Sequence, residues 1–386
     1  MNEDKSARYH RLRRRLSIAS VAWSALLLAA LLLTGLSASI RNAAASLTAS
    51  PALALVLYLA VLAVLHEPVS FALDFYDGYV LEHRYGLSRQ SATAWLRDHM
   101  KGLALGGVLA LGAASLVYLT MRIWPGWWWL ASGLVFAVLL VCLANLAPVL
   151  LLPLFFRFEP LDRPVLSERL HRMADRAGAS VMGVYRWHLG EKTSKANAAL
   201  TGIGATRRIL LADTMLDQYS DDEIEVVLAH ELAHHVHGDI WSGIVVEVLL
   251  LLAGFFAADL VLKFAGPLVG LQGLADPAGV PLLLLAAGAV SVLLLPAMLA
   301  LSRGHERRAD RFALDLTSNP DAFTSAMKRL GAQNLAEDQP SAIVQWLFYS
   351  HPPMSQRLAA AAAWARTHHA VAGSVPLADP LDRVGS

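Results

Sequence analysis

Long uncharged apolar runs constrain this chain more strongly than any other feature of its sequence. A helix needs about 20 mostly apolar residues to cross the hydrocarbon core of a bilayer. Five runs of this length contain no charged residue, and a sixth contains only Glu247 and Asp259. The runs cover residues 17–40, 42–65, 102–121, 123–156, 241–262 and 280–301. We therefore predict a mainly α-helical, polytopic membrane protein with about six transmembrane helices.

The composition supports this class and excludes others. Hydrophobic residues make up 56% of the 386 residues and charged residues 16%, whereas soluble domains carry about 25% charged residues. The formal net charge of +1 provides no electrostatic case for nucleic acid as a partner. Cys142 is the single cysteine, which excludes an intrachain disulfide. A disordered chain and a disulfide scaffold are therefore both excluded.

The distribution of lysine and arginine predicts the orientation. Of these 32 residues, 29 fall before residue 17 and within residues 84–101, 157–208 and 303–383. The other three, Arg41, Arg122 and Lys263, lie in the segments that would be on the opposite side of the membrane. Because cytoplasmic segments are enriched in lysine and arginine, we predict that both termini and residues 157–239 are cytoplasmic. In a bacterium the membrane would be the inner, or plasma, membrane. The first apolar run is longer than that of a signal peptide and is interpreted as an uncleaved anchor.

One predicted helix carries a candidate metal site. Ser220 and Glu223 have the spacing of a capping box, which indicates a helix N-terminus. Further along this helix, His230 and His234 lie one turn apart on the same face, as two ligands of one zinc ion would. Glu231 lies beside them, placed to act as general base toward a metal-activated water. This HExxH pattern is typical of zinc metalloproteases, and it is favoured over an exposed polar patch because its surroundings are uncharged or apolar.

A catalytic zinc site also needs a third protein ligand and one open position. His237 shares the helical face of His230 but lies about 10 Å further along the axis, too far to bind the same tetrahedral ion. Glu306, after the last apolar run, would complete a His₂Glu site. Asp310 lies four residues later on the same face and would accept the spare ring N–H of a ligand histidine. The alternative is a solvated charged helix, since arginines flank both acids.

These features predict five segments. They are an N-terminal membrane domain of four spans (1–156), a peptidase segment with the HExxH helix (157–240), two further spans (241–302), a C-terminal peptidase segment with the third zinc ligand (303–370) and a flexible tail (371–386). Residues 184–187 and 208–211 are predicted strands, and Pro352-Pro353 is a predicted helix break.

Several motifs resemble the M48 family of membrane zinc peptidases, and specifically its Ste24-type CAAX prenyl protease branch. The metal-site motifs are AHELAH at 229–234, ERRAD at 306–310 and SHPP at 350–353. Asn197-Ala198 followed by Thr201-Gly202 is similar to the segment that precedes the protease helix in this family. Residues 82–90 (EHRYGLSRQ) and 153–161 resemble the N-terminal membrane domain of the branch.

The resemblance implies a helical barrel that encloses a chamber, with a cytoplasmic zincin-like (gluzincin) catalytic domain that carries a small β-sheet. It implies one Zn²⁺ per chain, bound by His230, His234 and Glu306, with Glu231 as the base. It implies further that His351 stabilises the oxyanion of the tetrahedral intermediate. Asn197 and Ala198 would present an edge strand to the substrate backbone.

Three functional interpretations remain open. The first is a Ste24-like zinc endopeptidase that cleaves a peptide or protein substrate beside the lipid bilayer. The second is an HtpX-like protease that degrades damaged membrane proteins, which the four-span N-terminal half disfavours. The third is a transporter or scaffold with a relic site, which the complete set of ligands, base and Asp310 disfavours. The residues leave open whether the substrate is membrane-associated or lipidated.

Overall fold

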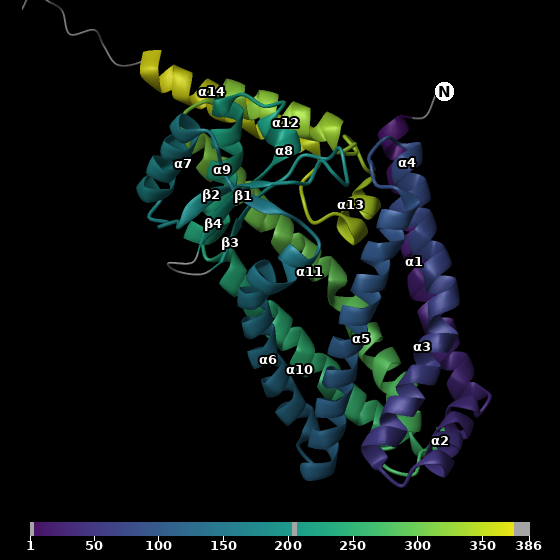
Figure 1. The fold of residues 1–386 in the computed structure, drawn as a ribbon. Coiled ribbons are helices and arrows are strands. Elements are labelled where there is room, and N and C mark those ends of the chain that lie inside the picture. The colour runs from purple at the N-terminus through teal and green to yellow at the C-terminus, as the bar shows by residue number, and fades with distance from the viewer. Residues whose placement is uncertain (1–3, 203–206, 374–386) are drawn as a thin grey trace, which may run out of the picture.

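The computed structural model describes residues 4–202 and 207–373 and is mostly helical, with a small β-sheet at one end (Figure 1). Within these residues, six helices are long and apolar enough to cross a membrane. They are α1 (Lys5–Leu33), α3 (Pro51–Phe75), α5 (Ala92–Ile123), α6 (Trp128–Leu146), α10 (Asp239–Ala265) and α11 (Val280–Thr317). The predicted number of spans is therefore confirmed.

The first two spans have different boundaries from those predicted. α1 ends before residue 34, and a short helix, α2 (Leu36–Leu47), precedes α3. Gly35 separates α1 from α2 with a φ of 72°, a left-handed conformation that glycine adopts without steric cost. Ser50 caps the N-terminus of α3, and Pro51 follows in its first turn. The second predicted span is present, but it begins at Pro51 and not at residue 42, because hydropathy does not register these local backbone preferences.

The six spans form a ring. Each of α1, α3, α5, α6, α10 and α11 packs against the next in this order, and α11 returns to α1. All six contribute to one buried core, at the end of the ring far from the sheet. Between that core and the sheet end, no residue is buried in the described stretches 10–30, 59–69, 92–116, 134–146, 240–253 and 287–302. A solid bundle would bury the middle of its helices, so this ring has the architecture of a barrel around a chamber.

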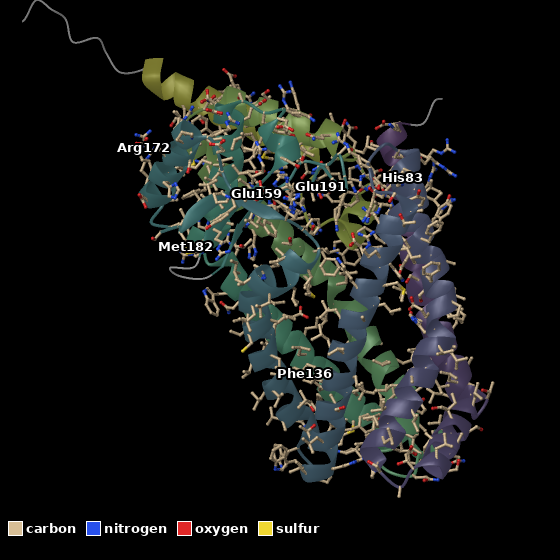
Figure 2. All side chains as sticks on the ribbon, viewed as in Figure 1. His83, Phe136, Glu159, Arg172, Met182 and Glu191 are labelled. Carbon is tan, nitrogen blue, oxygen red and sulfur yellow. The ribbon has the colours of Figure 1, made fainter. Side chains whose placement is uncertain are left out.

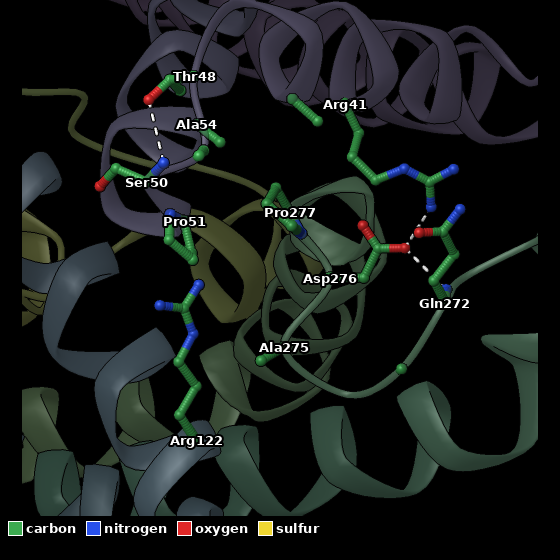
Figure 3. Close-up of a pocket in the computed structure, with 13 residues that line it drawn as sticks. Arg41, Thr48, Ser50, Pro51, Ala54, Arg122, Gln272, Ala275, Asp276 and Pro277 are labelled. Atoms are coloured by element: carbon green, nitrogen blue, oxygen red, sulfur yellow. Dashed lines mark hydrogen bonds and ion pairs between the residues drawn. The ribbon is translucent and has the colours of Figure 1, made fainter.

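Polar contacts tie together the far end of the barrel (Figure 3). Arg41 Nη1 lies 2.5 Å from Asp276 Oδ2, which also accepts a hydrogen bond from Gln272 N at 2.7 Å. Asp276 is buried, and Arg41 and Asp276 line a pocket of about 470 Å³ together with Arg122 from the end of α5. In the same region Asp259 is buried between Trp128 Nε1 and Lys263 Nζ, each 2.7 Å away. The few charged groups at this end are therefore mostly paired.

The other end of the molecule carries the sheet and most of the charged side chains (Figure 2). The sheet has the strand order β1-β2-β4-β3, in which β2 and β4 are parallel and the outer pairs antiparallel. Its strands are β1 (Phe158–Pro160), β2 (Gly183–Trp187), β3 (Ala198–Thr201) and β4 (Arg208–Ala212). The two predicted strands are confirmed as β2 and β4. β1 was not predicted because three residues carry too little periodicity to detect.

Helices from the middle of the chain and from its C-terminal part cover this sheet in a single core. They are α7 (Pro164–Arg176), α9 (Asp221–Val236), α12 (Pro320–Gln333) and α14 (Met354–Gly373), joined by part of α11. The predicted break at Pro352-Pro353 is confirmed, since α13 (Ala342–Phe348) ends before it and α14 begins after it. Of the predicted tail, residues 371–373 continue α14, and residues 374–386 lie outside the described residues.

Candidate metal centre

The helix that carries HExxH begins at the predicted cap. Ser220 Oγ accepts a hydrogen bond from Glu223 N at 3.2 Å, and Glu223 Oε2 accepts one from Ser220 N at 2.8 Å. This capping box starts α9, whose middle is buried in the core of the sheet end. Because α9 is packed on several sides, the orientation of its side chains is tightly defined.

α11 is long enough to bring a second set of side chains to α9. Its 38 residues correspond to about 57 Å, nearly twice the thickness of the hydrocarbon core. Beyond the apolar part, the buried residues Arg303, Glu306, Asp310 and Ala313 are spaced three or four apart, so they form one helical face. α11 packs against α9, and the ERRAD motif therefore directs its two acids to the HExxH helix.

His230, His234 and Glu306 form a cluster suited to a metal ion. Their ligand atoms all lie within 4.8 Å of one another. His230 Nε2 is 3.3 Å from Glu306 Oε2, and His234 Nε2 is 3.4 Å from Glu306 Oε1. The two imidazole rings stand nearly perpendicular, with their centres 5.0 Å apart. All three ligand groups thus converge on one small volume.

The other ring nitrogen of each histidine faces a carboxylate. His230 Nδ1 is 3.0 Å from Asp310 Oδ1, and His234 Nδ1 is 2.9 Å from Asp239 Oδ2. A carboxylate accepts the proton of Nδ1, so the lone pair of each Nε2 faces Glu306. Glu306 Oε2 is buried and has no hydrogen-bond partner among the described residues. Two lone pairs and a carboxylate repel one another unless a cation lies between them, so these residues fit a metal ion.

The pKa of His230 also indicates that its surroundings favour a positive charge. Burial by itself lowers the pKa of His230, but hydrogen bonds to Asp310 and Glu306 more than offset this and raise the pKa to about 9. The surrounding carboxylates therefore attract a cation to this position, which can be a proton or a metal ion.

Glu231 lies on the same helix, beside the cluster. Burial raises the pKa of its carboxyl group, while the positive charge that His230 and His234 can carry lowers it; the net direction is upward. A carboxylate with a raised pKa accepts a proton more readily than an ordinary surface glutamate. This environment suits a group that takes a proton during a reaction.

His351 reaches the cluster from the loop that precedes α14. Its Nε2 is 3.3 Å from Glu306 Oε1, and its side chain is 60% exposed. Arg303 holds the start of this loop to α13, because its Nη1 donates hydrogen bonds to Gln345 O of α13 at 3.1 Å and to Tyr349 O at 2.7 Å. The structure therefore brings His351 to the open side of the cluster.

Asn197 and Ala198 lie at the start of β3, which is an outer strand of the sheet and contacts α9. By contrast, His237 lies outside the cluster, with its ring 5.5 Å from that of Phe312. The predicted site residues thus gather on or beside α9. His237 follows the end of α9 but is not part of the cluster of His230, His234 and Glu306.

Two supporting residues were not predicted. Asp239 follows His234 by five residues, but the helix ends between them, so helical spacing does not indicate the contact. Arg357 donates to Asp310 Oδ2 at 2.8 Å and to Asp310 Oδ1 at 2.5 Å, and it is 10% exposed. Nothing in the local sequence links residues 47 positions apart, and only the fold brings them together.

Comparisons with known proteins give the family. Residues 160–365 match peptidase family M48, and residues 2–157 match the CAAX prenyl protease N-terminal region, described as five membrane helices. The described part of that region, residues 4–157, has four helices of spanning length and the shorter α2. An uncharacterized metalloprotease, YhfN of Bacillus subtilis (strain 168), is 30% identical over 302 residues, which cover 77% of this chain and 71% of that protein.

A CAAX prenyl protease 1 homolog of Oryza sativa subsp. japonica is 29% identical over 301 residues, covering 74% of this chain and 68% of that protein. The crystal structure of S. mikatae Ste24p superposes with a TM-score of 0.83 at 23% sequence identity, covering 92% of this chain and 88% of that one. The match over residues 2–157 favours the Ste24 type over the HtpX-like alternative. The chain therefore belongs to peptidase family M48 and is a multi-pass membrane metalloendopeptidase of the Ste24 type.

Proposed function

We propose that the metal is zinc and that His230, His234 and Glu306 bind it. The main support is that the Nε2 atoms of His230 and His234 both face Glu306. The Nδ1 atom of each histidine lies beside a different carboxylate. Two imidazoles and one carboxylate are a ligand set typical of catalytic zinc sites, which leave one position open. The exposed side of the cluster, where His351 lies, is that open side.

Bound there, zinc would supply Lewis acidity to the attacking water and to the scissile carbonyl. Glu231 takes a proton from the water as the water oxygen attacks the carbonyl carbon. Glu231 then delivers this proton to the amine nitrogen as the C–N bond breaks. His351 donates a hydrogen bond to the carbonyl oxygen as negative charge develops on it. Asp310 and Asp239 keep the histidine rings oriented throughout.

We propose that the substrate binds as an extended chain along β3, passing Asn197 and pairing first with the backbone of Ala198. An outer strand offers backbone N–H and C=O groups to a peptide, which is a general mode of recognition. β3 packs against α9, the helix that carries His230 and His234, so a peptide paired with this strand would lie beside the metal cluster. The relatives named as CAAX prenyl proteases support a lipidated substrate as the first one to test.

We also propose that the metal end of the molecule is cytoplasmic. The charged side chains concentrate at this end, and 29 of the 32 lysines and arginines lie in segments that would share that side.

Purified protein in detergent tests the proposed reaction. A farnesylated peptide and the same peptide without the lipid should both be offered, with products identified by mass spectrometry. We expect cleavage that a chelator abolishes, that Zn²⁺ restores, and that the Glu231→Gln variant lacks. Cleavage that survives chelation would contradict the metal mechanism, and equal rates for both peptides would contradict a preference for lipidated substrates.

A further inference from the structure

β3 presents alternate residues to its free edge. β3 pairs with β4 in a register that places Ala198 opposite Leu211, and Ala212 N donates to Asn197 O at 3.0 Å. In an antiparallel pair, hydrogen-bonded residues alternate with residues whose backbone groups point away from the partner. Positions 197, 199 and 201 therefore face β4, whereas positions 196, 198 and 200 face the free edge. Within the described residues, β3 pairs with no other strand.

Asn334 occupies the first of these edge positions. Its Oδ1 accepts a hydrogen bond from Ala196 N at 3.0 Å, and its Nδ2 donates one to Ala196 O at 3.1 Å. A single side-chain amide thus makes the two hydrogen bonds that a neighbouring strand would make. Gln333 Nε2 donates to Ser194 O at 2.8 Å, two residues earlier. The edge is therefore occupied up to Ala196 by the end of α12, and the next edge positions are Ala198 and Leu200.

The position of Asn334 is set by a strained helix end. Asn334 is the C-cap residue that directly follows α12. Leu335 comes next with a φ of 51°, in the left-handed region that usually requires glycine. Ala336 N donates to Gly331 O at 2.8 Å, which closes the turn. A leucine persists there because its side chain packs against the cluster of Tyr9, Leu81, Tyr85 and Leu87. The Leu335 carbonyl also lies 2.8 Å from His10 Nε2 of α1.

We infer that Asn334 ends the substrate-binding edge and so limits how many substrate residues pair with the enzyme on one side of the scissile bond. The inference rests on the proposed binding of substrate along β3. An extended peptide can pair with Ala198 and Leu200, but it must leave the strand before Ala196. Asn334 acts as a positioning residue, and it changes where the peptide chain leaves the enzyme and not the chemistry at the metal.

A series of peptides of increasing length tests this inference. The peptides share one scissile bond and are extended one residue at a time, first on one side and then on the other. In the wild-type protein, KM should stop falling after a few residues on one side only. In the Asn334→Ala variant, the next two residues on that side should lower KM further, by about 3- to 10-fold, because they can now pair with Ala196. The value of kcat at the unchanged cleavage position should stay within about 2-fold.

Backbone N-methylation locates the affected residue. Methylating the substrate residue that would face Ala196 should leave KM unchanged in the wild type and raise it in Asn334→Ala, because only the variant lets that N–H pair. Asn319→Ala is the matched control: Asn319 caps the other end of α12 by accepting from Ala322 N at 3.0 Å. The control should keep the wild-type length profile whatever it does to the melting temperature.

The outcomes separate this inference from the proposed function. A wild-type KM that keeps falling on both sides, or an Asn334→Ala variant with the wild-type profile, would overturn the role of Asn334 while cleavage remained intact. Absence of cleavage by the wild type, or its persistence in Glu231→Gln, would instead overturn the proposed function. If Asn334→Ala does not fold, the wild-type series still decides, because the one-sided limit must be present in it.

Discussion

Asp239 Oδ2 lies 2.9 Å from Nδ1 of His234, although the chain turns sharply between the two residues. The turn is at Gly238, whose φ of 67° ends α9 and starts α10. Asp239 Oδ1 also accepts a hydrogen bond from Arg308 Nη2 of α11 at 2.7 Å. One buried carboxylate therefore connects a proposed metal ligand to both long helices that enter the site from the membrane.

We predict that Asp239→Ala weakens zinc binding by about 10- to 100-fold, because the ring of His234 loses the acceptor that orients it. Asp239→Asn should have a smaller effect, since the amide oxygen can still accept from Nδ1. Competition with a chromophoric chelator measures the affinity. Asp321→Ala, an exposed aspartate in the first turn of α12, is the control and should bind zinc normally.

The proposed base and the proposed third ligand should behave differently. Glu231→Gln should retain zinc and lose cleavage by about 10²–10⁴-fold, because only proton transfer is removed. Glu306→Ala should lose both zinc and cleavage, because two histidines alone hold the ion weakly. Elemental analysis beside a peptide assay checks both variants. Full zinc occupancy in Glu306→Ala would contradict its assignment as a ligand.

Arg357 should matter for folding as well as for the site. Its guanidinium makes two hydrogen bonds to Asp310, and both side chains are largely buried. Arg357→Met would remove these hydrogen bonds and leave His230 as the remaining partner of the Asp310 carboxylate, which should cost about 1.5–3 kcal/mol of stability. We expect a lower melting temperature of the detergent-solubilised protein. Arg366→Met changes an exposed arginine on the same helix, and it should leave the melting temperature nearly unchanged.

Glu247 tests the chamber. It lies in α10 within residues 240–253, none of which is buried, and a carboxylate that faced lipid there would cost about 2.5–3.5 kcal/mol. We predict that it faces the hydrated interior. A cysteine at position 247, in a Cys142→Ala background, should react with a water-soluble maleimide, whereas one at the fully buried Ala258 should not. Labelling at 247 by a lipid-phase reagent alone would contradict a water-filled interior.

The orientation can be tested with reporters. An enzyme active only outside the cytoplasm should stay inactive when fused after residue 373, and should be active when inserted within residues 270–274, between α10 and α11. The physical reason is the concentration of lysine and arginine at the sheet end, because these residues are retained on the cytoplasmic side during insertion. The opposite pattern of activities would invert the proposed topology.

The sequence alone determined the membrane class, the number of spans, and the start of α9 at Ser220. It also predicted two helical faces, one with His230 and His234 and one with Glu306 and Asp310, because spacing along a helix depends on local geometry, and the structure brings these two faces together. An apolar run long enough to span a bilayer has few alternatives in water, and a helix places residues four apart on one face whatever surrounds it.

Only the tertiary structure decided the contacts that join distant segments. The pairing of Arg357 with Asp310, and of Asn334 with Ala196, depends on how helices of the C-terminal part pack against each other and against the sheet. Asp239 contacts His234 through a turn that helical periodicity cannot describe. Such hydrogen bonds leave no periodic trace in the sequence, because backbone and side-chain groups pair according to position in space and not to spacing along the chain.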